Sequence, residues 1–435
     1  MPYGASPMSS VLATTLIKIQ RYRQEMEGLL IYGDSFQDRI GQAFRQLLVG
    51  LSGQPAGPVA ALYGAWFQAL AETGQPWQSY VIEQVLLADN PFTRQVQHQG
   101  MERLPPALVE AVCADLTSLE SLYQLDPQQV ATWVAEVGEL PRVPVIWRIS
   151  SPSPTAFSFP PDLAWLESLP ALAHHYRCHG VGVLARYGAL GWQGGQLRGI
   201  AHPDPIRLEQ LAAYDRPRQQ LIQNTEALLR GYRALNVLLY GSRGTGKSSL
   251  VKALLNHYRD QGLRLVEVPK VDLVALPQIL ETLRPAPQKF IIFVDDLSFE
   301  EDDDGFKALK VVLEGGVRAR PDHVVVYATS NRRHLVREYF SDRPRPSDQD
   351  EVQAWDTVQE KLSFSDRFGL TLTFEPPDQP TYLAIVHHLA GQAGLPLEPE
   401  DLKAQALRWA TQHNGRSGRS ARQFIDWLRA QGDHR

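Results

Sequence analysis

One glycine-rich segment constrains the fold of this chain more than any other feature of its sequence. Residues 241–248 read Gly-Ser-Arg-Gly-Thr-Gly-Lys-Ser and match the pattern G-x-x-x-x-G-K-[ST] in full. The apolar run NVLLY (236–240) precedes this segment, and KSSLVKALLNHYRD follows it with helical spacing. A glycine loop between a buried strand and a helix leaves its backbone N–H groups free to surround phosphate oxygens. The segment therefore predicts a phosphate-binding loop within an α/β domain.

The predicted nucleotide contacts cover nine consecutive residues of this loop: Gly241, Ser242, Arg243, Gly244, Thr245, Gly246, Lys247, Ser248 and Ser249. In this pattern the lysine places a cation on the β- and γ-phosphates, and the next serine, Ser248, offers its hydroxyl to Mg²⁺. The chain contains no N-K-x-D motif of the kind that reads guanine. ATP and Mg²⁺ are therefore the predicted cofactors.

Compact apolar runs alternate with helical patterns in the second half of the chain. These runs are NVLLY (236–240), LRLVEV (263–268), KFIIFV (289–294), HVVVYA (323–328) and LTLTF (370–374). Continuous apolar runs of this length are typical of parallel strands that are buried on both faces. We expect residues 204–376 to form an α/β P-loop domain with helices on both faces of a parallel sheet. Residues 377–435 return to helical spacing and are expected to form a helical lid.

Two carboxylates, Asp295 and Asp296, follow the run KFIIFV directly. A carboxylate at the carboxyl end of a parallel strand beside a P-loop is where phosphate-bound Mg²⁺ needs a ligand. Asp295 is thus a predicted metal ligand together with Ser248, and Asp296 is predicted to orient or deprotonate the attacking water. The alternative is a pair of solvated aspartates, since the acidic run 300–304 follows and could itself supply the base.

Polar and basic residues near two further strands complete the predicted site. Asn331 follows HVVVYA, where its amide could contact the γ-phosphate or the attacking water, although asparagine there is often a turn residue. Arg367 precedes LTLTF, and Arg422 lies at the entry of the last helix, near Arg416 and Arg419. A guanidinium on a transferring phosphoryl group raises the rate by orders of magnitude. The alternative for each arginine is a surface salt bridge.

The first 200 residues carry no motif that indicates an activity. Residues 1–150 show helical spacing and are expected to form a mostly helical domain. Residues 151–203 are rich in Pro, Ser and Gly and are expected to connect the two halves through a short helix and a hairpin. The two cysteines cannot form a disulfide framework, and the histidine pairs at 174–175 and 387–388 lack metal-ligand spacing. We expect residues 1–200 to engage a protein client.

Charge and hydropathy narrow the classes of partner. The chain has 43 Lys+Arg and 48 Asp+Glu, and neither half is basic. No broad electrostatic footprint for nucleic acid is therefore visible. No apolar run is long enough for a transmembrane helix, and the first residues lack the pattern of a secretory signal. A cytoplasmic location is expected.

The order of these motifs resembles the AAA+ ATPase superfamily. More narrowly, NVLLYGSRGTGKSSLVKALL, FIIFVDDLSF, VVYATSNRRHL, LSFSDRFGL and SGRSARQF resemble a bacterial AAA+ family catalogued mainly as an ATP-binding domain of unknown function. This resemblance covers about residues 205–435. It implies Walker A at 241–248, Walker B at Asp295 and Asp296, sensor 1 at Asn331, an arginine finger at Arg367 and sensor 2 at Arg422.

The resemblance implies an ATPase that forms an ATP-dependent homo-oligomer and remodels or loads a partner, with Arg367 acting in trans. Many AAA+ proteins have glutamate where this chain has Asp296, and the shorter carboxylate suggests slow or partner-gated hydrolysis. An Asp-Asp box is also similar to that of replication initiators and helicase loaders. The alternative is therefore a nucleotide-dependent loader or scaffold with little turnover. A small-molecule kinase is disfavoured by the sensor and lid arginines, and residues 339–361 are interpreted as an insertion that contacts a subunit or partner.

Overall fold

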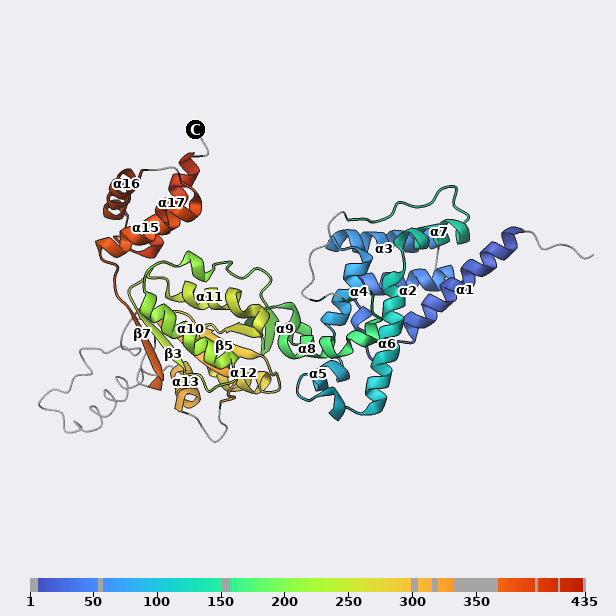
Figure 1. Cartoon of the computed structure of the whole chain (residues 1–435), viewed down its shortest axis with the longest axis horizontal. Helices are drawn as coiled ribbons and strands as arrows, with labels where there is room; N and C mark the ends of the chain where they lie inside the picture. Colours follow the sequence, from blue (N-terminus) through green and yellow to red (C-terminus); the bar gives the residue numbers. More distant parts are fainter. Residues whose placement is uncertain are drawn as a thin grey trace, which may run out of the picture. The chain divides into compact units, whose positions relative to one another are not determined.

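The chain folds as two compact units, Met1–Arg186 and Tyr187–Arg435 (Figure 1). The computed structural model describes residues 7–53, 58–149, 157, 159–160, 162–298, 304–314, 320–331, 367–395, 398–413 and 415–432. The predicted insertion at 339–361 and residues 300–303 of the acidic run lie outside these described residues. The first unit is helical and the second is built on a sheet, so the two halves of the sequence have the fold classes predicted for them.

The first unit is a helical assembly around one apolar core. Its helices are α1 (Pro7–Glu27), α2 (Arg39–Leu51), α3 (Val59–Thr73), α4 (Trp77–Leu86), α5 (Pro91–Val96), α6 (Pro106–Gln124), α7 (Pro127–Val137), α8 (Leu169–His179) and α9 (Gly182–Arg186), with short 3-10 turns at Gly33–Phe36, Met101–Arg103 and Trp165–Ser168. Large aromatic side chains fill the centre of this core. The ring of Phe44 lies 5.3 Å from that of Trp66 and 4.3 Å from that of Trp77. These rings join α2, α3 and α4 through contacts that add to their burial.

A buried carboxylate fixes the turn after α1 in the first unit. Asp115 of α6 is 2% exposed, and its side chain accepts backbone N–H bonds from Leu30, Ile31 and Tyr32 at 2.9, 2.7 and 2.9 Å. Asp115→Ala should lower the free energy of unfolding by about 3 kcal/mol, because three amide donors lose their acceptor. Urea titration followed by circular dichroism measures this, with Asp115→Asn as the control that keeps one acceptor oxygen. An unchanged midpoint in the alanine variant would contradict this role.

The second unit contains a seven-stranded sheet in the order β2-β1-β4-β5-β6-β3-β7. The strands are β1 (Ala189–Gln193), β2 (Gln196–Gly199), β3 (Val237–Gly241), β4 (Leu263–Glu267), β5 (Lys289–Val294), β6 (Val324–Ser330) and β7 (Leu370–Phe374). The five predicted runs are β3 to β7, and neighbours among them pair in parallel, which confirms the predicted sheet. The antiparallel hairpin β1–β2 extends this sheet because β1 pairs in parallel with β4.

Both faces of the central strands are buried, as the continuous apolar runs predict. Every residue of β6 is buried, and only the first residue of β5 is not. On one face, α10 (Asp215–Leu229) and α11 (Lys247–Tyr258) pack their apolar residues into the same core as β3, β5 and β6. Helices α12 (Leu276–Leu283) and α13 (Asp304–Glu314) follow β4 and β5. This arrangement brings the carboxyl ends of β3, β5 and β6 together at one edge of the sheet.

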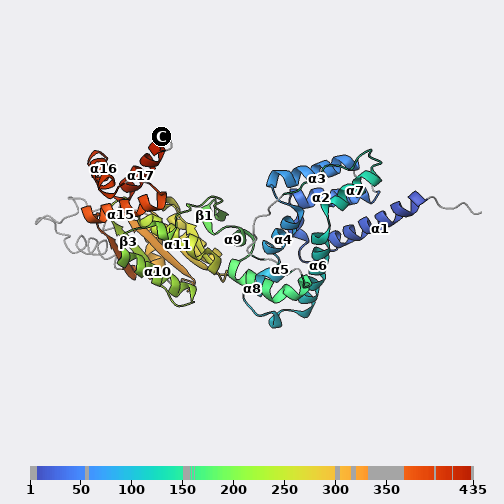
Figure 2. The ribbon, with the colours of Figure 1, turned by 45° about the horizontal axis from the view of Figure 1, so that its top comes forward.

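Three helices at the end of the chain form a small bundle with its own core. These are α15 (Gln379–Ala393), α16 (Pro399–Gln412) and α17 (Gly418–Gly432), which lie side by side in both views (Figures 1 and 2). Their core includes Tyr382, Ala406 and Phe424, each at most 1% exposed. The bundle is the helical lid predicted from the sequence.

The segment 151–203, predicted as a connecting region, contributes to both units. Helix α8 packs into the core of the first unit, where Leu172 and Tyr176 are fully buried. The hairpin of β1 and β2 instead belongs to the sheet of the second unit.

Candidate functional site

The P-loop occupies the turn between β3 and α11. Strand β3 ends at Gly241 and α11 begins at Lys247. Gly241, Gly244 and Gly246 have φ angles of 143°, 75° and 89°, a region that side chains disfavour. A Cβ atom at Gly241 would also collide with the backbone of Phe374 in β7. The glycines therefore permit the tight turn that brings the loop over the N-terminus of α11, where anions are favoured.

Lys247 is held inside the loop. Its side chain is 6% exposed, and its Nζ donates to the carbonyls of Gly241 and Ser242 at 2.9 and 2.7 Å. A longer contact of 3.4 Å joins the same Nζ to the amide oxygen of Asn331. Burial lowers the pKa of Lys247, and the charges of Asp295 and Asp296 oppose that effect. The ammonium is thus positioned by carbonyls alone and surrounded by little water, so an anion placed beside it would interact strongly.

Asp295 joins three elements at the end of β5. Its carboxylate accepts a hydrogen bond from the Ser248 hydroxyl of α11 at 2.6 Å, and another from the Thr329 hydroxyl of β6. The sequence analysis predicted Ser248 and Asp295 as partners in metal binding, and the structure brings them into direct contact. Thr329 was not predicted, although it lies two residues before Asn331 in the same ATSN segment.

Asp296 and Asn331 also meet at this edge of the sheet. The amide nitrogen of Asn331 donates to the carboxylate of Asp296 at 2.5 Å. Asp296 has a φ of 50°, which is uncommon outside glycine, and its backbone N–H donates to the Thr329 hydroxyl at 2.9 Å. Such backbone strain persists only where the surrounding contacts fix it, and it concentrates at functional sites. Asn331 therefore links the predicted base, Asp296, to Lys247.

These side chains face one cavity of about 720 Å³. Its walls come from the P-loop and the first turn of α11 (243–249), from the ends of β5 and β6, from residues 206–212, and from α15 and α17 of the lid. Gly241 and Ser242 are absent from this lining, and their carbonyls hold Lys247 instead. The volume is within the range of small-molecule and cofactor sites.

The lid contacts the P-loop through its last helix. The backbone N–H of Arg419 donates to the carbonyl of Gly244 at 3.2 Å. A Cβ atom added to Gly244 would lie 3.1 Å from the Ser417 side chain, and one added to Gly418 would lie 2.9 Å from the Gly244 carbonyl. Glycine at both positions thus allows the start of α17 to approach the loop closely.

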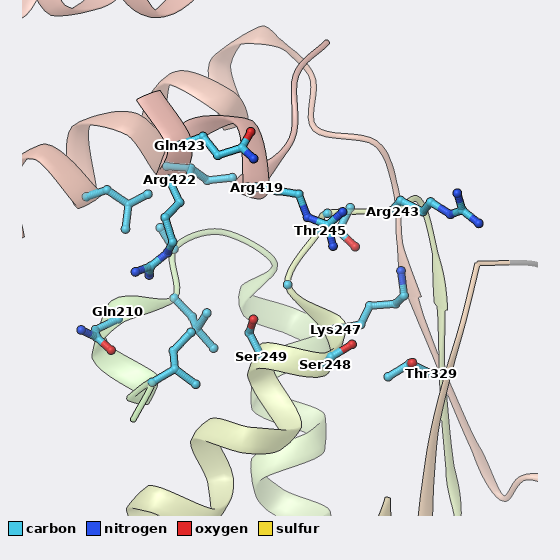
Figure 3. A pocket seen from close by; sticks show the side chains of 18 of the residues that line it. Gln210, Arg243, Thr245, Lys247, Ser248, Ser249, Thr329, Arg419, Arg422 and Gln423 are labelled. Carbon is cyan, nitrogen blue, oxygen red and sulfur yellow. The ribbon is translucent and has the colours of Figure 1, made fainter. Parts of the chain in front are cut away.

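The arginines near the start of α17 take different places. Arg419 and Arg422 line the cavity, whereas Arg416 donates to Gln379 at 3.1 Å and lies outside the lining. Figure 3 shows Arg419 beside Thr245 and Arg422 extending toward the turn that carries Gln210. Arg243 also lines the cavity, but its guanidinium points away from those of the lid arginines.

Arg367 lies outside the cavity lining of its own chain. Its Nε is 2.7 Å from the carboxylate of Glu314 at the end of α13. The residue immediately precedes Phe368, Gly369 and strand β7. This position is compatible with a role toward a neighbouring subunit, which the sequence analysis predicted for it.

The sequence analysis missed the end of the cavity opposite the predicted phosphate contacts. Ile206 and Leu211 line it from the segment before α10, and Ile385 and Leu389 line it from α15. The carbonyl of Glu209 is held 2.7 Å from the Nε2 atom of His388 and 2.7 Å from the amide nitrogen of Gln392, both on α15. No spacing in the sequence connects residues 206–211 to α15, so only the fold reveals this apolar wall.

No helix among the residues that the structure describes is long and apolar enough to cross a membrane. This finding agrees with the absence of a long apolar run in the sequence.

The second unit has a recognised family. Residues 185–432 match the family described as "Protein of unknown function (DUF815)". This match confirms the resemblance to a family of unknown function that the motifs of residues 205–435 indicated. A search of curated proteins finds no match.

Solved structures similar to this chain include forms of RuvB from Thermotoga maritima. Two point variants have 14% and 15% sequence identity, cover 52% of this chain and 72% and 66% of theirs, and give TM-scores of 0.32 and 0.35. The structure titled as the RuvB Holliday junction branch migration motor has 14% identity, covers 52% of this chain and 72% of its own, and has a TM-score of 0.32. The family match, which spans more than half of the chain and includes the P-loop, both aspartates and the lid, shows that this chain belongs to the DUF815 family.

Proposed function

We propose that the second unit binds ATP with Mg²⁺ and hydrolyses it as an AAA+ ATPase, coupling this cycle to the remodelling or loading of a partner. One observation carries the proposal. Lys247, Ser248, Asp295, Asp296 and Asn331, which come from a loop, a helix and two strands, converge on a single cavity beneath the lid. A cation, a hydroxyl, two carboxylates and an amide are the groups that phosphoryl transfer to water requires.

The oxygen donors at the end of β5 fit Mg²⁺. The hydroxyl of Ser248 lies 2.6 Å from the carboxylate of Asp295, so both are within reach of one small ion. Among the described residues, no group of three or more His, Cys, Asp or Glu is placed to hold a metal. This suits Mg²⁺, which usually takes one or two protein ligands and keeps water and phosphate oxygens as the others. When bound, Mg²⁺ would neutralise charge on the β- and γ-phosphates.

The chain's own residues would act on the water and the γ-phosphate. Asp296 would accept a proton from water as the water oxygen forms a bond to the γ-phosphorus. The bond from that phosphorus to the β,γ-bridging oxygen breaks, and ADP leaves with the electron pair. Asn331 holds the Asp296 carboxylate at 2.5 Å and would orient it until the γ-phosphate is bound. Lys247 would stabilise the negative charge on the β- and γ-phosphates.

Steady-state ATP hydrolysis by the full chain tests this function. Asp296→Asn should lower kcat by about 100-fold, the effect expected for loss of a general base, while ATP binding persists. Asp401→Asn, an exposed residue of α16, is the matched control and should hydrolyse ATP at the rate of the unmodified chain. Equal turnover in the Asp296 and Asp401 variants would overturn the role of Asp296.

The three lid arginines should differ in their effect on nucleotide affinity. Arg419→Ala and Arg422→Ala should each weaken ATP binding about tenfold, because a charge-assisted contact inside the cavity is lost. Arg416→Ala should bind ATP normally, since Arg416 contacts Gln379 outside the cavity. Titration with a fluorescent ATP analogue measures the three affinities. Equal affinities in all three variants would mean that no lid arginine reaches the nucleotide.

A second candidate function is a nucleotide-dependent loader or scaffold switch with little turnover. The observation that favours it is that two proposed catalytic groups are engaged within the chain. Asp296 accepts from Asn331, and Arg367 pairs with Glu314. Tight ATP binding without measurable hydrolysis would favour this switch, and the client of residues 1–200 would then be the trigger to seek.

A further inference from the structure

A second cavity lies at the edge of the sheet in the second unit. It has a volume of about 200 Å³ and is lined by β1, β4, α11 and the residues that follow β2. Leu190, Leu255 and Leu265 give it a buried apolar wall. The volume is below the usual range for drug-sized ligands and suits a molecule the size of a free amino acid.

Two opposite charges face this cavity. Lys252 comes from α11 and Glu267 from the end of β4, and both side chains are half-buried. Within the part of the chain that the structure describes, neither side chain has a hydrogen-bond or ion-pair partner, and their charged atoms are more than 4.0 Å apart. Charged groups that are partly removed from water normally pair, because desolvation disfavours an isolated charge. An unpaired ammonium and an unpaired carboxylate beside an apolar wall thus form a complement to a molecule that carries both charges and an apolar tail.

We propose that this cavity binds a free α-amino acid with an aliphatic side chain. Its ammonium group would pair with Glu267, its carboxylate with Lys252, and its side chain would lie against the leucines. His202 and Asp204 also line the cavity but are exposed. A metal is not the ligand that this chemistry indicates, since no three His, Cys, Asp or Glu of the described residues are gathered to hold one.

The amino-acid cavity and the nucleotide cavity share a wall. Asn256 of α11 donates to the carbonyls of Asp204 and Ile206 at 2.8 and 2.7 Å. Asp204 lines the smaller cavity and Ile206 the larger one, so one short segment borders both. The binding proposal nevertheless stands apart from ATP hydrolysis and is tested without nucleotide.

Isothermal titration calorimetry of the full chain with L-leucine tests the proposal. L-leucine should bind saturably. Isocaproate, which lacks the ammonium group, and isoamylamine, which lacks the carboxylate, should each bind at least about tenfold more weakly, because each loses one charge-assisted contact. These two analogues test the zwitterion requirement on the unmodified chain, so the result does not depend on any variant folding. The absence of saturable heat with L-leucine, or equal affinity for the three molecules, would overturn the proposal.

Charge-removing variants then locate the bound molecule. Lys252→Met and Glu267→Gln should each weaken L-leucine binding at least about tenfold. The matched controls are Lys403→Met and Glu400→Gln, which remove an exposed pair on α16 and should bind like the unmodified chain. Thermal melting checks that all four variants are folded. Unchanged affinity in the folded Lys252 and Glu267 variants would place the binding elsewhere and overturn the site.

Discussion

Replacing Lys247 with alanine is expected to abolish ATP binding at micromolar nucleotide. The ammonium of Lys247 lies inside the P-loop and would contact the β- and γ-phosphates, so the variant loses two charge-assisted hydrogen bonds. The loss corresponds to a rise in Kd of at least about 100-fold. Titration with a fluorescent ATP analogue measures the change. Unchanged affinity would refute the assignment of 241–248 as the nucleotide loop.

Two further measurements separate this effect from a general loss of charge or fold. Lys403→Ala removes a lysine on α16 that pairs with Glu400 and should leave the affinity for ATP unchanged. The pH dependence provides the second. Because burial lowers the pKa of Lys247, its ammonium should deprotonate at a lower pH than that of an ordinary lysine. Affinity for ATP should therefore decline as the pH rises into the alkaline range, and the decline should be absent in Lys247→Ala.

Arg367→Ala is expected to lower kcat for ATP hydrolysis by about 1,000-fold while ATP affinity is retained. A guanidinium supplied across a subunit interface stabilises the charge of the transferring phosphoryl group, and effects of this size are usual for it. Arg367 lies outside the cavity of its own chain, so its loss should spare binding. The rate per chain should also rise with protein concentration in the unmodified protein, since assembly completes the site. Steady-state assays over a concentration series measure both effects.

Glu314→Gln is the matched control for Arg367, because it removes the ion pair and keeps the guanidinium. Its turnover should equal or exceed that of the unmodified chain. Mixing provides a stricter test of action in trans. Arg367→Ala and Asp296→Asn are each inactive, yet mixed assemblies contain interfaces with an intact Asp296 on one chain and an intact Arg367 on the next. Activity should return on mixing, and its absence in assemblies shown to be mixed would exclude a trans role.

The P-loop and the five parallel strands could be predicted because their signals are local. Each strand is a continuous apolar run, and the loop has a fixed pattern of glycines with Lys247 and Ser248. The convergence of Asp295, Asp296 and Asn331 also followed from the rule that carboxyl ends of parallel strands share one edge. These parts of the site need no knowledge of how distant segments pack.

Other parts of the site depend on contacts between segments that are remote in the sequence. The wall formed by Ile206 and Leu211 exists only because α15 holds the carbonyl of Glu209. The left-handed backbone of Asp296 is likewise imposed by its neighbours, since Thr329 accepts its N–H. The different places of the lid arginines depend on where α17 begins relative to Gly244, and arginine spacing alone cannot reveal that.

The hairpin of β1 and β2 determines where the second unit can be separated from the rest of the chain. Strand β4 has β5 on one side and β1 on the other. A fragment that started at residue 204, the domain boundary expected from the sequence, would remove β1 and leave the amide and carbonyl groups along one side of β4 without partners. Open strand edges of this kind recruit other chains and promote aggregation. For expression of the ATP-binding unit alone, the useful starting point is therefore before Tyr187, so that the protein carries its own protection against self-association.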